Sequence, residues 1–160
     1  MTGKPVPAKA FEPEFVAAVR QIFEEKVAFN MVLGLKLDRL EPDLVTGHID
    51  MKPELVGHYM RQQLHGGVVS AALDAMGGAA SLTAVSARHM DEPPLQRLHR
   101  FVKLGTIDLR IDYLRPATGQ KFLVSAQVLR LGSRVCTTRM EMASPDGKLF
   151  ATGAAAFIVS

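Results

Sequence analysis

The chain has 160 residues and a formal net charge of +3, because 19 Lys and Arg face 16 Asp and Glu. This length is typical of one domain, and 48% hydrophobic with 22% charged residues excludes a disordered chain, a collagen and a multi-span membrane protein. The single cysteine, Cys136, excludes an internal disulfide and a paired-cysteine metal or redox site. The small positive charge does not indicate a nucleic-acid binder, although a local basic patch could meet an anionic small molecule.

Two segments decide whether the chain is directed to or through a membrane. The first ten residues contain two prolines and no apolar run, so no secretory signal is predicted and a cytoplasmic location is expected. Residues 66–87 have the length of a membrane span. They contain four glycines, few bulky aliphatic residues and one carboxylate, so we predict a helix buried in a protein core, without membrane insertion.

The other elements follow from hydrophobic periodicity and turn residues. Residues 13–30 place apolar side chains at helical spacing, and residues 107–114 alternate apolar with polar side chains. Proline, glycine and aspartate mark turns at 41–43, 132–133 and 145–147. In chain order we predict a helix (13–30), two short strands (35–40 and 45–51), a mixed loop (53–63), the buried helix (66–86), a polar excursion or short helix (91–100) and four strands (107–114, 122–131, 134–143 and 149–159).

This order of elements favours an α+β fold with an antiparallel sheet over a doubly wound fold, because the strands cluster after the helices. The last four strands are expected to form a meander. They need a hydrophobic element to wrap, and the helix 66–86 is the candidate, since its glycines and alanines permit close approach to a sheet. No internal repeat is visible, so residues 1–160 are predicted to form one domain with an N-terminal helix.

Asp74 is the only charged residue within the predicted central helix. Burying an isolated carboxylate is costly unless the group is paired or hydrogen-bonded. Asp74 therefore has either a structural partner, such as an arginine or a neighbouring loop, or a catalytic use. The residues alone leave both possibilities open.

His65, Gly66 and Gly67 stand just before this helix. Two glycines at a helix entry let a ligand come close, and free N–H groups of the first turn can bind a carbonyl oxygen that gains negative charge. The alternative is a plain tight turn with His65 as a cap. Asp74 follows Gly67 by two helical turns, about 10.5 Å, which is too far to act on a carbonyl bound at its own helix. The spacing therefore predicts a dimer with shared active sites.

Two arginines are the best candidates for holding an anionic group. Arg115 and Arg134 are predicted to lie at strand ends, where an anionic tail such as a phosphate could bind. The alternative is that they face only water, as most strand arginines do. Tyr59 is expected to line a pocket or the core. The five histidines show no metal-ligand spacing, and no cofactor-binding motif is present, so no metal and no cofactor are predicted.

The segment 105–116, GTIDLRIDYLRP, is the longest distinctive run of the chain. The shorter runs are Leu55-Val56-Gly57, Leu64-His65-Gly66-Gly67-Val68, Ala72-Leu73-Asp74 and Arg88-His89. Together they resemble the hotdog-fold acyl-CoA thioesterases of the PaaI type, most closely the YigI branch. The likeness extends from Phe29 to the end of the chain.

The resemblance implies a hotdog fold, in which a curved antiparallel sheet wraps a long central helix, and a homodimer or homotetramer. It also implies hydrolysis of medium- or long-chain acyl-CoA to free acid and CoA, without a bound cofactor. By this resemblance Asp74 is the base or nucleophile. The Gly67 amide polarises the thioester carbonyl, and His65 and Gly66 shape that turn.

One position departs from the family pattern. The family often has Asn after the glycine that corresponds to Gly57, and this chain has His58 there. A neutral His58 can hydrogen-bond the attacking water, and Gln62 or Gln63 are alternatives for that role. Two other functions stay open on the same fold: a non-catalytic acyl-CoA-binding protein, and a dehydratase or hydratase. A pure binder gains nothing from a carboxylate beside the ester, and the dehydratases use a catalytic histidine that the helix 66–86 lacks.

Overall fold

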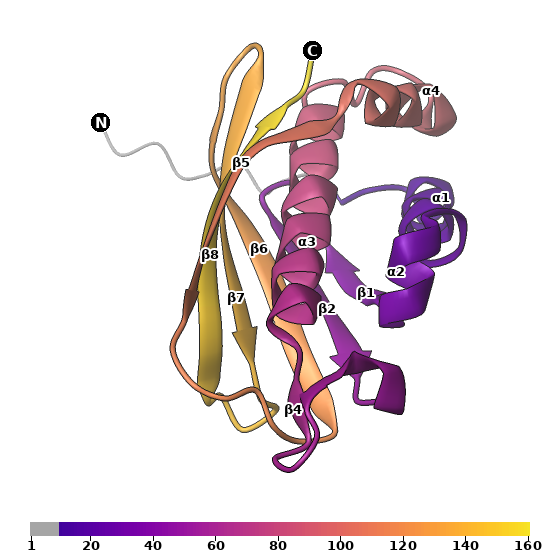
Figure 1. The fold of residues 1–160 in the computed structure, drawn as a ribbon. Coiled ribbons are helices and arrows are strands. Elements are labelled where there is room, and N and C mark those ends of the chain that lie inside the picture. Colours follow the sequence, from indigo (N-terminus) through magenta and orange to yellow (C-terminus); the bar gives the residue numbers. More distant parts are fainter. Residues whose placement is uncertain (1–9) are drawn as a thin grey trace.

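The computed structural model describes residues 10–160, in which six antiparallel strands form one curved sheet around a long helix (Figure 1). Residues 1–9, on which the expectation of no secretory signal depends, lie outside this part. The strands of the sheet are β1 (Lys36–Leu40), β2 (Leu44–Asp50), β5 (Gly105–Tyr113), β6 (Lys121–Leu131), β7 (Val135–Ala143) and β8 (Leu149–Ile158). The predicted α+β hotdog fold is confirmed.

The central helix is α3 (Gly66–Ala87), and every residue from Met76 to Ser86 is buried. By length and hydropathy α3 could cross a membrane, but most of it is buried inside the protein, which confirms the prediction of a core helix. Its small residues allow this burial. A Cβ added at Gly77 would lie 2.8 Å from ring atoms of Phe157 in β8, so the helix backbone lies directly against this ring.

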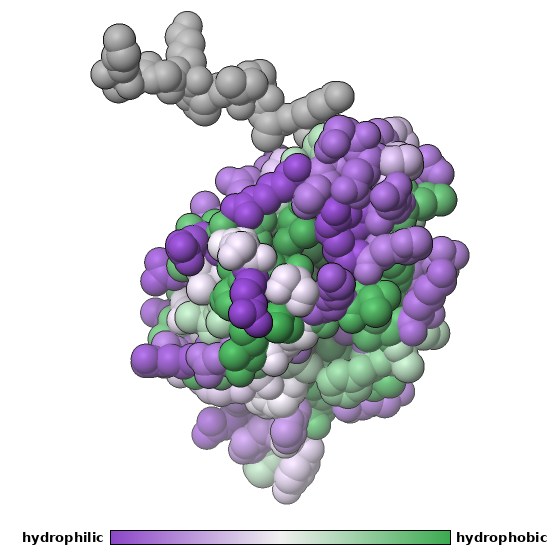
Figure 2. All heavy atoms as spheres, turned by 90° about the horizontal axis from the view of Figure 1, so that it is seen from above, coloured by the Kyte–Doolittle hydropathy of each residue, from purple (hydrophilic) through white to green (hydrophobic). Residues whose placement is uncertain are grey.

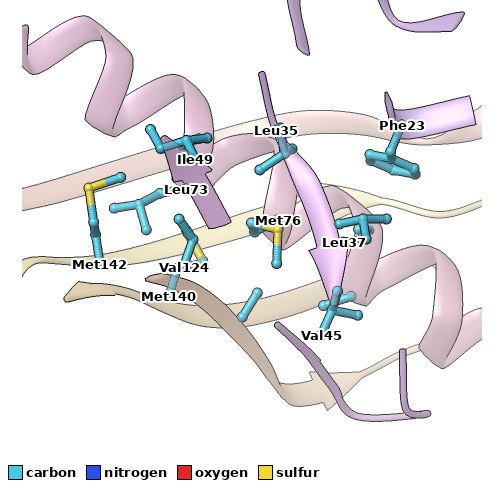
Figure 3. Close-up of a cluster of buried hydrophobic side chains, with 14 of the residues drawn as sticks. Phe23, Leu35, Leu37, Val45, Ile49, Leu73, Met76, Val124, Met140 and Met142 are labelled. Carbon is cyan, nitrogen blue, oxygen red and sulfur yellow. The ribbon is translucent and has the colours of Figure 1, made fainter. Parts of the chain in front are cut away.

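The hydrophobic core lies between the sheet and α3 (Figure 3). Leu73 and Met76 of α3 are fully buried, and alternate residues of β2, such as Val45 and Ile49, point to the same side. This alternation is the period of two that places every second strand residue on one face. Cys136 of β7 is also fully buried. At the end of the molecule that carries α4, hydrophilic residues surround scattered apolar ones (Figure 2).

The predicted N-terminal helix is divided into three segments. These are α1 (Pro13–Gln21), the π-helical η1 (Ile22–Lys26) and α2 (Ala28–Leu33). Val27 has an extended backbone, with φ −80° and ψ 99°, and it breaks the helix. The Asn30 side chain donates a hydrogen bond of 3.0 Å to the Phe23 carbonyl, which satisfies an acceptor that the break leaves open. Gly34 ends α2 in the left-handed conformation.

The sheet order is β1-β2-β6-β7-β8-β5. The expected four-strand meander is therefore wrong in the connection from β5 to β6. β6, β7 and β8 form a meander, but β5 pairs with β8 at the far edge of the sheet and not with β6. β6 instead pairs with β2 over seven residues. The segment 114–120 joins β5 to β6 across the end of the sheet. It touches the short hairpin of β3 (Val56–His58) and β4 (Gln63–Leu64) through a bridge between Thr118 and Gln63.

The polar stretch after α3 contains a short helix, α4 (Pro94–Leu98), followed by a 3-10 segment, η3 (His99–Lys103). Another 3-10 segment, η2 (Pro53–Leu55), precedes β3. Arg97 of α4 is fully buried, which its polar surroundings in the sequence did not indicate. Its guanidinium pairs with Glu12 and lies 4.8 Å from the ring centroid of Phe15, so α4 is held against α1.

Candidate active site

Asp74 lies on α3 and is half-buried. Its Oδ1 accepts a hydrogen bond of 2.8 Å from the Thr106 hydroxyl of β5. No lysine, arginine or histidine pairs with Asp74 among residues 10–160. The carboxylate therefore has a neutral partner that orients it, and its charge is not cancelled by a cation. Sequence reasoning assigned no role to Thr106, although this residue stands in the distinctive run 105–116.

An apolar pocket of about 260 Å³ opens beside this carboxylate. It lies between α3, the start of β5 and the N-terminal helical segments. Its walls include Ala75 and Gly78 of α3, Phe23 and Val27 near the helix break, Phe101 of η3 and Phe157 of β8. A carboxylate at the wall of an apolar pocket is a common arrangement in active sites, because the pocket holds an apolar group and the charged group acts on its reactive end.

The N-terminus of α3 places the glycine pair. His65 caps the helix, and its Nδ1 accepts a hydrogen bond of 2.9 Å from the Gly67 N–H. The next two amides, of Val68 and Val69, donate to the His65 carbonyl. The Gly66 N–H is the first-turn amide with no partner among the described residues. The Gly66 amide is therefore open at this helix end, whereas the Gly67 amide, to which the resemblance gives the role of polarising the carbonyl, has the His65 ring as its acceptor.

The β3–β4 hairpin brings His58 and Tyr59 to the same end of α3. A Cβ at Gly57 would lie 2.5 Å from the His65 Cα, so glycine lets β3 lie directly against the start of the helix. His58 ends β3 with an exposed side chain, and its ring stacks on that of Tyr59 with 6.4 Å between centroids. The Gln62 side chain donates to the Tyr59 carbonyl at 2.7 Å, so it is engaged within the hairpin.

Arg115 and Arg134 lie at opposite ends of the sheet. Arg115 follows β5 and lines a second pocket, of about 240 Å³, together with Gly66 and Tyr113. Arg134 precedes β7, whose nine residues span about 30 Å. Both side chains are exposed, and the Arg115 guanidinium donates to the Leu149 carbonyl at 3.0 Å. Within one chain the structure does not bring the two arginines together.

Within one chain, the candidate carboxylate and the Gly66 amide at the start of α3 lie in different pockets. Asp74 lines the apolar pocket and Gly66 lines the second pocket, and the two pockets share no residue. No group of three or more His, Cys, Asp or Glu within residues 10–160 is arranged to hold a metal ion. The groups that the two pockets present are a carboxylate, a hydroxyl and a backbone amide.

The family model of the thioesterase superfamily matches residues 62–151, from just before the glycine pair to the third residue of β8. The chain belongs to the thioesterase superfamily. The resemblance carried by the sequence is thereby confirmed, and the expectation of a thioester hydrolase is confirmed at the level of the family. The match contains α3 with Asp74, the glycine pair and Thr106.

Individual relatives of this thioesterase cover almost the whole chain. The medium/long-chain acyl-CoA thioesterase YigI of Salmonella typhimurium is 34% identical over 141 residues, which is 88% of this chain and 91% of that protein. YigI of Escherichia coli K12 is 33% identical over the same shares. A crystal structure from Shewanella oneidensis, described as related to the thioesterase superfamily, has a TM-score of 0.84 at 37% identity. It covers 94% of this chain and all of that one.

Proposed function

We propose that this protein hydrolyses the thioester of medium- or long-chain acyl-CoA to free acid and CoA. The observation that carries the proposal is the Asp74 carboxylate, which has no cationic partner among residues 10–160 and faces an apolar pocket. The similarity to YigI, named a medium/long-chain acyl-CoA thioesterase, supports the substrate class. We place the protein in the cytoplasm and treat residues 1–160 as one domain.

Asp74 acts as general base or as nucleophile in this proposal. As a base, its carboxylate takes a proton from a water molecule while the water oxygen bonds to the thioester carbon. As a nucleophile, the carboxylate oxygen bonds to that carbon, and water then cleaves the resulting anhydride. In both routes the C–S bond breaks, the CoA thiolate leaves and is protonated, and the acyl group ends as a free acid. The Thr106 hydroxyl fixes the carboxylate for either route.

The carbonyl oxygen gains negative charge as the bond to carbon forms, and donors at the start of α3 can stabilise it. The Gly66 N–H is free for this, and the partial positive charge at a helix N-terminus adds to the effect. The Gly67 N–H can join if the His65 ring turns away, since the His65 Nδ1 is its present acceptor. His65 thus holds the turn and controls whether the second amide is available.

A complete site needs two copies of the chain in this proposal. Asp74 and Gly66 line different pockets of one chain, so a carbonyl bound by Gly66 of one copy would meet Asp74 of another. The edge strand β5 is the natural contact, because it pairs with β8 on one side and has no strand partner on the other within the described residues. It exposes Ile107 and Tyr113, and Leu114 follows it. An unpaired edge with exposed apolar side chains favours a homodimer, which can assemble further into a homotetramer.

The CoA portion would bind at the pocket that Gly66 and Arg115 line, near the β3–β4 hairpin that carries Tyr59. Arg115 can hold a phosphate, and the exposed Tyr59 ring offers a stacking surface for the adenine. Arg134 can contribute to the same CoA if it comes from the second copy, since it lies at the other end of its own sheet. His58 would hold the attacking water in place of the asparagine of the family.

Thiol release from a panel of acyl-CoA thioesters tests the function. The wild-type protein should release CoA, and Asp74→Asn should lower kcat by about a thousandfold, because an amide cannot act as base or nucleophile. The thermal unfolding temperature of this nearly isosteric variant should stay close to wild type. Binding of acyl-CoA without release by the wild type, or a near-normal kcat of Asp74→Asn, would contradict the proposal.

A further inference from the structure

Two adjacent glycines of α3 differ in what surrounds them. A Cβ at Gly77 would lie 2.8 Å from ring atoms of Phe157, so the packing of helix on sheet requires glycine there. A Cβ at Gly78 would lie 3.7 Å from Leu104 Cδ2 and 3.8 Å from Phe157 Cε1, which is ordinary van der Waals contact. Packing therefore does not require glycine at position 78. Its missing side chain instead leaves space, and that space belongs to the apolar pocket beside Asp74.

Gly78 follows Asp74 by one turn of α3, about 6 Å along the helix axis. Both residues line the same pocket, and Leu104 and Phe157 line it as well. An acyl group whose carbonyl carbon lies next to the carboxylate would extend its chain along this face of the helix. The volume that Gly78 leaves open is therefore on the path of the chain.

The remaining wall of the pocket comes from outside the sheet and α3. Phe23 of the π-helical segment meets Phe101 of η3 edge to face, with 5.6 Å between ring centroids. Both segments are held in place: Asn30 bonds the Phe23 carbonyl, and the buried Arg97 ties α4, which leads into η3, to Glu12 before α1. This wall is preformed, because its aromatic pair is supported from both sides.

We propose that Gly78 and the Phe23–Phe101 pair set the length of acyl chain that this protein accepts. Gly78 leaves room for the acyl chain one helical turn after Asp74, and the aromatic pair limits how far the acyl chain extends. The inference rests on the proposed thioesterase function and adds the residues that select among its substrates. It predicts opposite effects for two single substitutions.

The experiment measures kcat/KM for straight-chain acyl-CoAs from butanoyl to hexadecanoyl. Gly78→Ala should lower the ratio of long-chain to short-chain kcat/KM by about tenfold or more, since one added methyl group in an apolar pocket has an effect of this size. Phe101→Ala should raise the same ratio by about tenfold toward the longer chains. Val102→Ala is the matched control, because Val102 is the next residue of η3 and is 85% exposed. It should leave the chain-length profile unchanged.

Thermal unfolding shows whether Gly78→Ala only fills the pocket or also disturbs the packing of the helix. Replacing a glycine inside a helix favours folding where room exists, so Gly78→Ala should unfold at or above the wild-type temperature while losing long-chain activity. The inference is overturned if wild type hydrolyses the panel and the folded Gly78→Ala keeps the wild-type profile, or if Val102→Ala shifts the profile equally. If wild type hydrolyses no acyl-CoA of any length, the proposed function itself fails and this inference fails with it.

Discussion

The Thr106 hydroxyl donates a hydrogen bond of 2.8 Å to Asp74 Oδ1, and so joins the edge strand β5 to the central helix. Asp74 Oδ2 has no partner among residues 10–160. One oxygen of the carboxylate is therefore fixed and the other is free to bind a proton or a carbon atom. In the proposed mechanism Thr106 would act on the reaction through Asp74, as a positioning residue.

Thr106→Val should lower kcat about tenfold with little change in KM. A hydrogen bond to a charged group contributes about 1.5–3 kcal/mol, and a barrier change of about 1.4 kcal/mol is tenfold in rate. Thr106→Ser keeps the hydroxyl and should stay near wild type, which serves as the control. Steady-state kinetics on one acyl-CoA checks both variants. Equal activity of the valine and serine variants would remove Thr106 from the mechanism.

Gly66→Pro removes the free amide at the start of α3 and should lower kcat about a hundredfold, the usual loss for one oxyanion donor. Proline is tolerated at the first position of a helix, and His65 before it already has the extended backbone that proline favours. Gly66→Ala keeps the N–H, and its Cβ would lie at ordinary distance, 3.5 Å, from the Tyr113 ring. It should therefore retain most of the activity. Similar losses in both variants would point to packing against Tyr113 instead.

Mixed subunits test whether sites are shared. Asp74→Asn and Gly66→Pro should each keep at most about a hundredth of wild-type activity, but a heterodimer of the two would have one site with both groups intact. After subunit exchange at equal amounts, about a quarter of wild-type activity should return, because half of the dimers are mixed and one of their two sites works. Sedimentation establishes the dimer, and a tagged subunit verifies the exchange. Verified exchange without recovery, or a monomer, would show that the site is contained in one chain.

Arg115→Ala and Arg134→Ala should raise KM for acyl-CoA several-fold more than they lower kcat, since the phosphates of CoA are remote from the reacting carbon. KM of the wild type should rise with ionic strength, because exposed arginine–phosphate contacts are screened by salt. Arg139→Ala, an exposed arginine in the middle of β7, is the control. Equal KM values of the wild type for acyl-CoA and for a truncated acyl-pantetheine would argue against any phosphate contact.

His58→Ala should lower kcat about tenfold if His58 holds the attacking water, an effect within the range of a lost hydrogen bond. His58→Asn should remain active, because asparagine also hydrogen-bonds a water and is the residue that the family often has at this position. Met60→Ala, at the exposed tip of the same hairpin, controls for loop disturbance. If the alanine variant turns over as fast as wild type, His58 has no part in positioning water.

Cys136 should not react with a thiol reagent in the folded protein. Burial raises the pKa of its thiol, although a hydrogen bond with Ser81 and the charge of Arg88 oppose the shift. A raised pKa keeps the thiol protonated at mildly alkaline pH, and the thiolate is the reactive form. Labelling with a disulfide reagent should be slow in buffer and fast in denaturant. Labelling at the same rate in both would show that β7 opens readily, and the thiol-release assay would then need correction for this residue.

Local patterns along the chain were sufficient to predict α3, the strand positions and the candidate carboxylate. Small apolar residues over more than twenty positions predict a buried helix. Close packing inside a protein stabilises such a helix surface more than contact with water or lipid does. Alternation and turn residues located β6, β7 and β8 to within a residue or two, because these signals act over a few neighbouring positions. An isolated charge within α3 was enough to single out Asp74.

Relations between distant segments were decided by the tertiary structure. β5 pairs with β8 because that strand edge is free once β2 has paired with β6. The hydrogen bond between Thr106 and Asp74 depends on the same pairing. The break at Val27 and the contact of Phe23 with Phe101 depend likewise on packing between segments far apart in sequence. The free amide belongs to Gly66 because the His65 ring turned back onto Gly67, a rotamer choice that residue order does not specify. Local sequence restricts the backbone of each segment, whereas strand partners and side-chain contacts follow from the competition among all segments for the same core.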